Sequence, residues 1–280
     1  MVGSRALRHR VRRGIRSASA VLYAGSEVYC PVCQRHLRKF VPSKLESTLG
    51  PPAQQPAGSP GDPSLACPAC GSLTRHRLLI LFLANCTDVL ERPLRMLHFA
   101  PEPCLHDRFR ASPHLDYVAA DLDAGRPMID VAADITAIPF PDDSFDVAIA
   151  SHVLEHVPDD VRALRELRRV LRPAGRAFLQ HPIDPSRKRT YEDATIVDPD
   201  ERRRAFGQHD HVRVYAEDFG ERVRGAGFSV DLVRYRDRVS AEEARRCALR
   251  ESGPLRGDDI YVCSPTEEDV RETTSNGRGI

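Results

Sequence analysis

Short blocks of apolar residues alternate with amphipathic stretches along most of the chain. Strands inside a parallel sheet are covered on both faces, so they appear in a sequence as continuous apolar runs. Runs of this kind predict strands over residues 94–100, 116–120, 145–150, 176–180, 228–235 and 259–263. The intervening stretches predict helices over 78–90, 159–171 and 241–250. Strands separated by helix-length segments indicate an α/β fold with a doubly wound parallel sheet.

The segment 159–171 shows the helical pattern most clearly. Leu164, Leu167 and Val170 fall on one stripe of a helix, and the arginines between them fall on the opposite face. Such a stripe is the side that a helix packs against a core. Pro173 and Gly175 follow, and both residue types are typical of a helix end.

Composition divides the chain into four sections. They are a basic, loosely ordered N-terminus (1–25), a cysteine-containing module (26–77), the α/β domain (78–265) and a polar, disordered tail (266–280). Within the module, residues 50–63 contain so many prolines and glycines that neither a helix nor a central strand can form there. We expect this stretch to be an exposed loop.

The overall composition excludes several classes of protein. Hydrophobic residues make up 41% of the chain, which is enough to fill a core. Lys and Arg number 41 against 40 Asp and Glu, and so small an excess disfavours a dedicated nucleic-acid binder. The arginines at the start precede no apolar run, so no secretory signal is predicted. The longest apolar run, 78–84, is too short to span a bilayer. We therefore expect a cytoplasmic protein without a membrane partner.

Two Cys-x-x-Cys pairs predict a metal site. Thiols stay reduced in the cytoplasm, so paired cysteines there indicate metal binding before disulfides. Cys30 and Cys33 form the first pair, and Cys67 and Cys70 form the second. Two such pairs complete a tetrahedral zinc site, and because no coordination position stays open, the Zn²⁺ is expected to be structural. The residues expected not to bind it are His36, His76, Cys86, Cys104, Cys247 and Cys263.

Acidic residues lie at the ends of expected strands in the first half of the sheet. Asp121 directly follows the strand 116–120, where a carboxylate can accept both ribose hydroxyls of a nucleoside cofactor. Asp134 precedes the strand 145–150 and is placed to accept the exocyclic amine of an adenine, with Ile135 packed on the ring. The sequence thus predicts a nucleoside-cofactor site at the carboxyl edge of the sheet.

The stretch from Asp134 to Asp146, followed by residues 151–157, resembles the class I methyltransferases that use S-adenosylmethionine, with a type 11-like domain. The turns at 171–176 and 225–228 continue the resemblance, which covers about residues 94–263. It implies a Rossmann-like sheet of seven strands with the last one antiparallel. It also implies S-adenosylmethionine as the cofactor, held by the ends of the first four strands, and here a zinc ribbon precedes the domain.

The turn after the first strand departs from the family. Ala100 and Glu102 stand where glycine is usual, and His98 stands where an acidic residue is common. The combination of this turn, the zinc ribbon and the segment 206–213 resembles one subgroup of the family. The cofactor-binding residues that the resemblance and the strand positions imply are His98, Phe99, Ala100, Glu102, Asp121, Leu122, Asp134, Ile135, Ser151 and His152.

The acceptor side is predicted from histidines. Methyl transfer from a sulfonium depends chiefly on alignment, but an oxygen acceptor also needs a base, for which histidine is suited at neutral pH. We expect His152 and His211 to be the catalytic candidates, with packing roles open for both. His211 adjoins Asp210 in a segment, about 184–216, expected to cover the acceptor. In the same segment Arg213 is suited to hold an anionic acceptor.

Three classes of function stay open at this point. Near-neutral charge and a polar lid favour O- or N-methylation of a small molecule or a biosynthetic intermediate. The basic start and the zinc ribbon are also features of methyltransferases for ribosomal RNA or tRNA, but no cluster of base-stacking aromatic residues accompanies them. A non-catalytic binding protein that keeps the fold is the third class.

Overall fold

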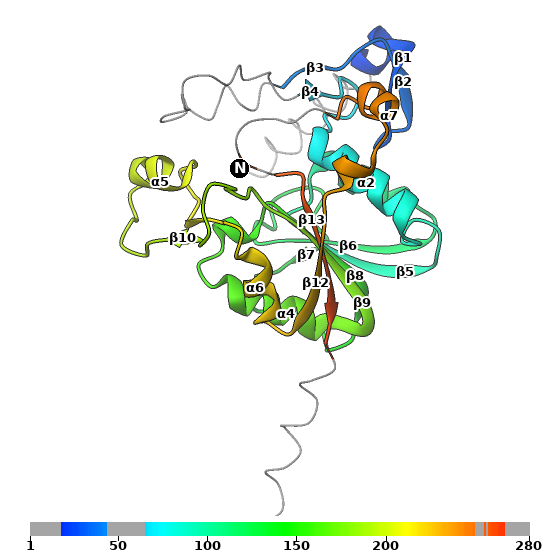
Figure 1. Cartoon of the computed structure of the whole chain (residues 1–280). Helices are drawn as coiled ribbons and strands as arrows, with labels where there is room; N and C mark the ends of the chain where they lie inside the picture. Colours follow the sequence, from blue (N-terminus) through cyan, green and yellow to red (C-terminus); the bar gives the residue numbers. More distant parts are fainter. Residues whose placement is uncertain (1–17, 44–64, 250–254, 256, 267–280) are drawn as a thin grey trace, which may run out of the picture.

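The computed structural model describes residues 18–43, 65–249, 255 and 257–266, and a seven-stranded sheet lies at its centre (Figure 1). The strands are β5 (Leu94–Phe99), β6 (Leu115–Asp121), β7 (Val131–Ala132), β8 (Phe145–Ser151), β9 (Leu171–Gln180), β12 (Phe228–Val233) and β13 (Ile260–Pro265). Their order across the sheet is β12-β13-β9-β8-β5-β6-β7. The last strand, β13, runs antiparallel to both neighbours, whereas β5 to β9 pair in parallel. The predicted α/β Rossmann-like sheet is confirmed.

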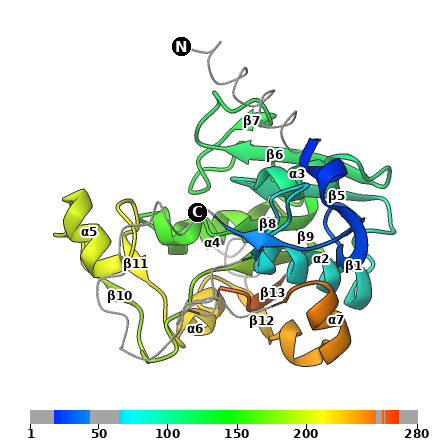
Figure 2. The same cartoon turned by 90° about the horizontal axis from the view of Figure 1, so that it is seen from above.

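Two apolar clusters fill the space on the two faces of the sheet. The helices are α2 (Thr74–Cys86), α3 (Pro103–Arg110), α4 (Asp160–Val170), α5 (Pro199–Phe206), α6 (Phe219–Arg224) and α7 (Ala241–Arg246). One cluster joins α2 and α3 to one face, and the other joins α4 and α6 to the opposite face (Figure 2). The central strand β8 is buried at six of its seven positions because it is covered from both sides.

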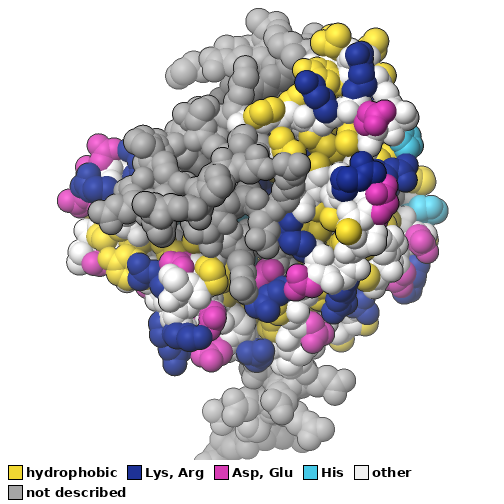
Figure 3. Space-filling view, turned by 45° about the horizontal axis from the view of Figure 1, so that its top comes forward, with side chains coloured by type: hydrophobic (Ala, Val, Ile, Leu, Met, Phe, Trp, Pro, Cys, Tyr) yellow, Lys and Arg dark blue, Asp and Glu magenta, His cyan; other side chains and the backbone are white. Residues whose placement is uncertain are grey.

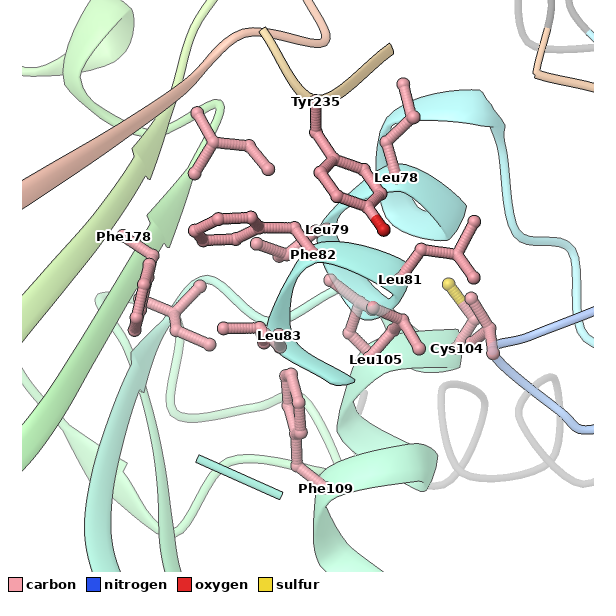
Figure 4. Packing of buried hydrophobic residues seen from close by; sticks show 14 of the residues in the cluster. Leu78, Leu79, Leu81, Phe82, Leu83, Cys104, Leu105, Phe109, Phe178 and Tyr235 are labelled. Atoms are coloured by element: carbon pink, nitrogen blue, oxygen red, sulfur yellow. The ribbon is translucent and has the colours of Figure 1, made fainter. Parts of the chain in front are cut away.

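Most of the length of helix α2 packs against the apolar cluster on its face of the sheet. Figure 4 shows Phe82 between Phe178 of β9 and Tyr235, with ring centroids 6.1 Å and 5.8 Å apart. Leu79 and Leu83 are buried on the same helix. Aromatic rings at such separations in edge-on geometry contribute beyond the apolar area that they bury. The packing holds α2 firmly on the sheet.

Some element boundaries differ from the sequence prediction. The helix predicted over 78–90 begins at Thr74, because His76 Nδ1 accepts the Leu73 N–H at 3.0 Å and so caps an earlier turn. It ends at Cys86, where Thr87 Oγ1 donates to Leu83 O at 2.6 Å and the chain becomes extended.

Other helices also differ, and α5 and α6 were not predicted. The helix predicted over 241–250 ends at Arg246, and Ala248 then adopts a left-handed φ of 51°. Helix α3 was not predicted at all, although Pro103 stands at its first turn, where proline is favoured.

The cysteine-containing module consists of two small antiparallel pairs of strands. They are β1 (Ala24–Cys30) with β2 (Arg35–Leu37), and β3 (Val41–Pro42) with β4 (Leu65–Ala66). The module lies beside α2 and α7 at the top of Figure 1, and its apolar residues belong to the same cluster as α2. Three sequence-based expectations lie outside the described residues: a loose N-terminus up to residue 17, the loop 50–63 and a disordered tail beyond residue 266.

The segment predicted to cover the acceptor has its own local structure. Strands β10 (Tyr191–Glu192) and β11 (Arg213–Val214) pair antiparallel, and α5 lies between them in the chain. This segment stands out on the left of Figure 1. The structure also contains two short 3₁₀ helices, η1 (Leu154–His156) and η2 (Tyr235–Arg238). Within the described part of the chain, every helix is too short or too polar to cross a bilayer.

Candidate functional site

A cleft of about 600 Å³ opens at the carboxyl ends of β5, β6 and β8. This is the edge where open α/β sheets hold their ligands, and the volume is within the range of about 300–1,000 Å³ that is common for small-molecule sites. Seven of the residues predicted to bind the cofactor line the cleft, namely Phe99, Ala100, Asp121, Leu122, Asp134, Ile135 and His152. His98, Glu102 and Ser151 are not among its lining residues.

Asp121 lies at the end of β6 and is held by two neighbours. Its Oδ1 accepts the Asp123 N–H at 2.8 Å, and its Oδ2 is paired with the Arg126 guanidinium. Arg126 also donates to Pro101 O at 3.1 Å and so connects Asp121 to the loop after β5. Because an ionised carboxylate has about four acceptor positions, these contacts leave room for further donors.

Asp134 is oriented by its own turn. Its Oδ1 accepts both the N–H and the hydroxyl of Thr136, each at 2.8 Å. Ile135 follows with only 5% of its surface exposed and lines the same cleft. Both of these contacts end on one oxygen, so the second oxygen can face a ligand.

The turn after β5 has the left-handed backbone conformation that glycine usually adopts, although the residue there is alanine. Ala100 has a φ of 46°, in the left-handed region that favours glycine, and it lines the cleft. A non-glycine residue in this region is strained by roughly 1–2 kcal/mol. The backbone therefore approaches the cleft closely even though the sequence departs from the family there.

Behind this turn, Glu102 joins three elements. Its Oε1 accepts from His76 Nε2 of α2 at 3.1 Å and from the Ser151 hydroxyl at the end of β8 at 3.2 Å. Since His76 Nδ1 accepts the Leu73 N–H, the ring proton belongs on Nε2 and is donated to Glu102. Burial alone would raise the pKa of Glu102, but His76, His98 and Arg75 hold it well below its ordinary value.

His98 lies on the far side of the same turn from the cleft. It is fully buried, and its Nδ1 is 3.0 Å from the Tyr117 hydroxyl. Its Nε2 is 3.7 Å from Glu102 Oε2, and its ring meets Phe109 edge-on. His98 and Glu102 were both predicted to bind the cofactor, but in the structure they contact the protein interior and support the turn from behind.

His152 follows β8 and stands on the cleft wall. Its φ of 55° is left-handed, and its Nδ1 lies 3.3 Å from Glu155 Oε1. Burial, followed by the charge of Arg75, lowers the pKa of His152. The shift favours the neutral imidazole, which is the form that can accept a proton.

Glu155 itself is almost completely buried, with 2% of its surface exposed. Its Oε2 lies 3.2 Å from His181 Nδ1, opposite His152. Burial by itself would raise the pKa of this carboxyl, but the two histidines hold it well below its ordinary value. A buried carboxylate is thus retained next to the cleft.

His211 lies one layer behind the cleft wall. Its ring contacts His156 edge-on with centroids 4.6 Å apart, and its Nδ1 is 3.1 Å from Phe206 O. His156 and Asp210 do line the cleft, and His156 Nδ1 is 3.4 Å from Asp210 Oδ2. Burial lowers the pKa of His211.

Arg213 has a different role from the expected anion binding. It is buried, and its guanidinium donates to the backbone carbonyls of Leu154, Val157 and Pro158 and to Glu192. Because these partners accept hydrogen bonds from the guanidinium, Arg213 connects β11 with β10 and with η1. The prediction that it holds an acceptor is wrong for this arrangement.

The structure brings the four paired cysteines together. Their sulfurs lie within 4.8 Å of one another, with Cys30 Sγ 3.7 Å from Cys70 Sγ and Cys33 Sγ 3.8 Å from Cys67 Sγ. A zinc ion with four sulfurs at about 2.3 Å in a tetrahedron separates those sulfurs by roughly 3.8 Å. The cluster therefore fits zinc, and His76 is turned away from it toward Glu102.

Several cleft residues were not predicted from the sequence. They are Ala133, Thr136, Val153, Val157, Pro158 and Asp159. Most of them are close in the chain to predicted residues, so the strand ends could have indicated them. Asp210 comes from the lid segment, and only the folded chain places it opposite β8.

Comparisons with known proteins find methyltransferases similar to parts of this chain. The demethylmenaquinone methyltransferase of Paenarthrobacter aurescens (strain TC1) is 34% identical to this chain over 135 residues, covering 38% of this chain and 53% of that protein. The chloroplastic 2-methyl-6-phytyl-1,4-hydroquinone methyltransferase of Arabidopsis thaliana is 29% identical over 154 residues, covering 52% of this chain and 41% of that protein. The chain thus spans about half of the length of these curated relatives, or less.

Among solved structures, the 1,6-didemethyltoxoflavin-N1-methyltransferase of Burkholderia thailandensis is similar, with a TM-score of 0.46 and 16% identity over 69% of this chain and 79% of that chain. Residues 108–179 match the family model of the methyltransferase domain, and they run from α3 through β6 and β8 into β9. The matched region includes Asp121 and Asp134 of the cleft.

Proposed function

We propose that the protein is an S-adenosylmethionine-dependent methyltransferase that methylates oxygen or nitrogen of a small-molecule acceptor. One observation carries the proposal: Asp121 at the end of β6 and Asp134 after β7 line the same cleft at the carboxyl edge of the sheet. A pair of carboxylates at this edge suits the sugar and the base of a nucleoside cofactor.

In this proposal each group of the cleft binds one part of the cofactor. Asp121 accepts the ribose hydroxyls, and Asp134 accepts the adenine amine through its second oxygen. Ile135 and Leu122 supply apolar contacts to the adenine ring. The left-handed backbone at Ala100 lies against the methionine part.

The reaction needs correct alignment more than activation. The acceptor atom attacks the methyl carbon of the sulfonium, a new bond to carbon forms, and the C–S electron pair stays on sulfur. Positioning alone is worth effective molarities of roughly 10⁵–10⁸ M. His152 stands on the cleft wall as a neutral imidazole and is placed to take the proton that an oxygen or nitrogen acceptor loses.

A small molecule is the favoured acceptor class. The names of the two curated relatives each specify a small-molecule substrate, a demethylmenaquinone and a hydroquinone. On the described part of the face in Figure 3, basic and acidic side chains are interspersed. An RNA acceptor would be favoured by a continuous basic surface instead.

We also propose that the four cysteines bind a structural Zn²⁺. The sulfur separations carry this proposal, since they match those of a tetrahedral thiolate site. Thiols of this kind persist in a reducing compartment, which supports a cytoplasmic location. The ion would hold the module in place beside α2.

The test is calorimetric titration of the full chain with S-adenosylhomocysteine. Replacing Asp121 with alanine removes hydrogen bonds to a charged group worth about 1.5–3 kcal/mol, so the affinity should fall roughly 10- to 100-fold. Asp116→Ala is the matched control, because Asp116 lies near the opposite end of the same strand and is exposed.

Equal affinity of both variants and the wild type would reject the assignment of Asp121. No binding of the cofactor product to the folded wild-type chain would reject the proposed function and favour a non-catalytic binding protein.

A further inference from the structure

A cluster of metal-binding side chains lies beside the cleft, apart from the four cysteines. Glu155 and His156 belong to η1, and His211 comes from the lid segment. One ligand atom of each lies within 4.8 Å of those of the other two. Two imidazoles and one carboxylate form a set that binds divalent transition metals while leaving coordination positions open.

His211 has the protonation pattern that a metal-binding histidine needs. His211 Nδ1 is 3.1 Å from Phe206 O and donates its proton to that carbonyl. This hydrogen bond leaves Nε2 without a proton and turned away from Phe206. A ligating histidine in metalloproteins typically donates its other ring N–H in the same manner.

The carboxylate gives an independent indication. Glu155 is 2% exposed, and its Oε2 is hydrogen-bonded to His181. Its Oε1 makes no well-formed hydrogen bond among the described residues and lies 3.3 Å from His152 Nδ1, at the distance of an ion pair. A buried carboxylate oxygen in this state is costly unless a further group binds it. A cation is the group that suits it best.

We propose that Glu155, His156 and His211 bind a divalent transition-metal ion at the acceptor end of the cleft. His156 lines the cleft, so the open coordination positions of the ion face the space next to His152. The ligand class that these positions would take is a molecule with a hydroxyl group, or with two adjacent oxygens.

The role of the ion rests on the proposed function, whereas its binding does not. A metal-bound hydroxyl loses its proton more readily than a free one. That proton passes to His152, and the oxygen lone pair then forms the bond to the methyl carbon. The C–S electron pair remains on sulfur, so the products are a methyl ether and S-adenosylhomocysteine.

The experiment uses zinc-loaded full-length protein dialysed against Co²⁺, followed by elemental analysis of both metals. Nitrogen and oxygen ligands suit Co²⁺, while the four thiolates keep their zinc. We expect Co²⁺ to bind beside an unchanged zinc content. His211→Ala should weaken Co²⁺ binding by about tenfold or more, as the loss of a metal contact typically does.

His209→Ala is the matched control, because His209 is exposed and adjoins the same Asp210. Glu155→Gln is a second variant that keeps the size of the side chain, and it should also weaken Co²⁺ binding. Circular dichroism and binding of S-adenosylhomocysteine check that each variant is folded and keeps its cofactor site.

Three results would overturn the inference. They are absence of Co²⁺ from the folded wild type, equal Co²⁺ binding by His211→Ala and the control, and uptake of Co²⁺ only in exchange for zinc. Failure of the cofactor site alone has a different signature, because S-adenosylhomocysteine would then not bind while Co²⁺ still did.

Discussion

Arg77 connects the cysteine cluster to the α/β domain, and its replacement by methionine should destabilise the protein strongly. The residue is fully buried on α2. Its guanidinium donates to Ser72 O at 2.6 Å, Ala248 O at 2.9 Å, Leu65 O at 3.1 Å and Thr74 Oγ1 at 3.3 Å. Among the described residues no carboxylate forms an ion pair with it. Its counter-charge is the cysteine cluster, since burial lowers the pKa of Arg77 and the thiolates of Cys30 and Cys67 raise it.

The size of the expected loss in unfolding free energy follows from the polar groups that would lose Arg77 as their partner. Methionine fills similar space but donates no hydrogen bond, so the carbonyls of Leu65, Ser72 and Ala248 lose this donor. Each unsatisfied buried group costs about 1–3 kcal/mol, part of which is regained by burying the apolar side chain. Four thiolates around one Zn²⁺ carry net negative charge, and removal of one member of a buried charge pair typically costs about 3–5 kcal/mol. We expect a loss of about 4 kcal/mol.

Urea unfolding of the zinc-loaded full chain measures this loss, with Arg77→Lys as the matched control. Lysine keeps the charge but lacks the planar fork that reaches several carbonyls, so its loss should be smaller. After removal of zinc by a chelator, the difference between wild type and Arg77→Met should shrink. A loss below about 1 kcal/mol with zinc bound would refute the reasoning, because that is the range of an ordinary surface substitution.

Two further predictions concern pH. The pKa of Glu102 is lower in the folded state than its ordinary value, so its carboxylate stabilises the fold above that value, and this contribution disappears as the pH falls through the folded pKa. Glu102→Gln should therefore lower the urea midpoint at pH 7, and this loss should shrink progressively as the pH falls below the ordinary glutamate value of about 4.5, whereas a loss that stays constant down to acidic pH would contradict this. The pKa of His152 is also lowered, so the neutral base should persist below the ordinary histidine value, and the rate of methyl transfer should fall only at more acidic pH. His152→Asn should remove that acidic limb, and an unchanged pH–rate profile would exclude His152 as the base.

The sequence determined much of the architecture and the position of the cleft. Strand β8 was predictable because its apolar run is continuous, and a run of this kind has few alternatives to a buried parallel strand. Asp121 was predictable at the carboxyl edge because it ends the apolar run of β6, whereas Asp134 follows β7, a short strand that was not predicted. The Cys-x-x-Cys pairs predicted their own convergence, since the short spacer turns both thiolates of a pair toward one point.

Only the tertiary structure decided the partners of the buried charges. Glu102 was predicted to touch the cofactor, yet it accepts from His76 and Ser151 behind the turn. Arg213 was predicted to hold an acceptor, yet its donors end on backbone carbonyls of η1 and on Glu192.

The physical reason is the distance along the chain between the residues that determine each feature. Local periodicity and spacing depend on neighbours in the chain, whereas the partner of a buried polar group depends on which distant elements the core packs against it. His211 meets Glu155 and His156 only because the lid segment returns to the end of β8. The local sequence pattern alone does not predict this contact between the lid segment and the end of β8.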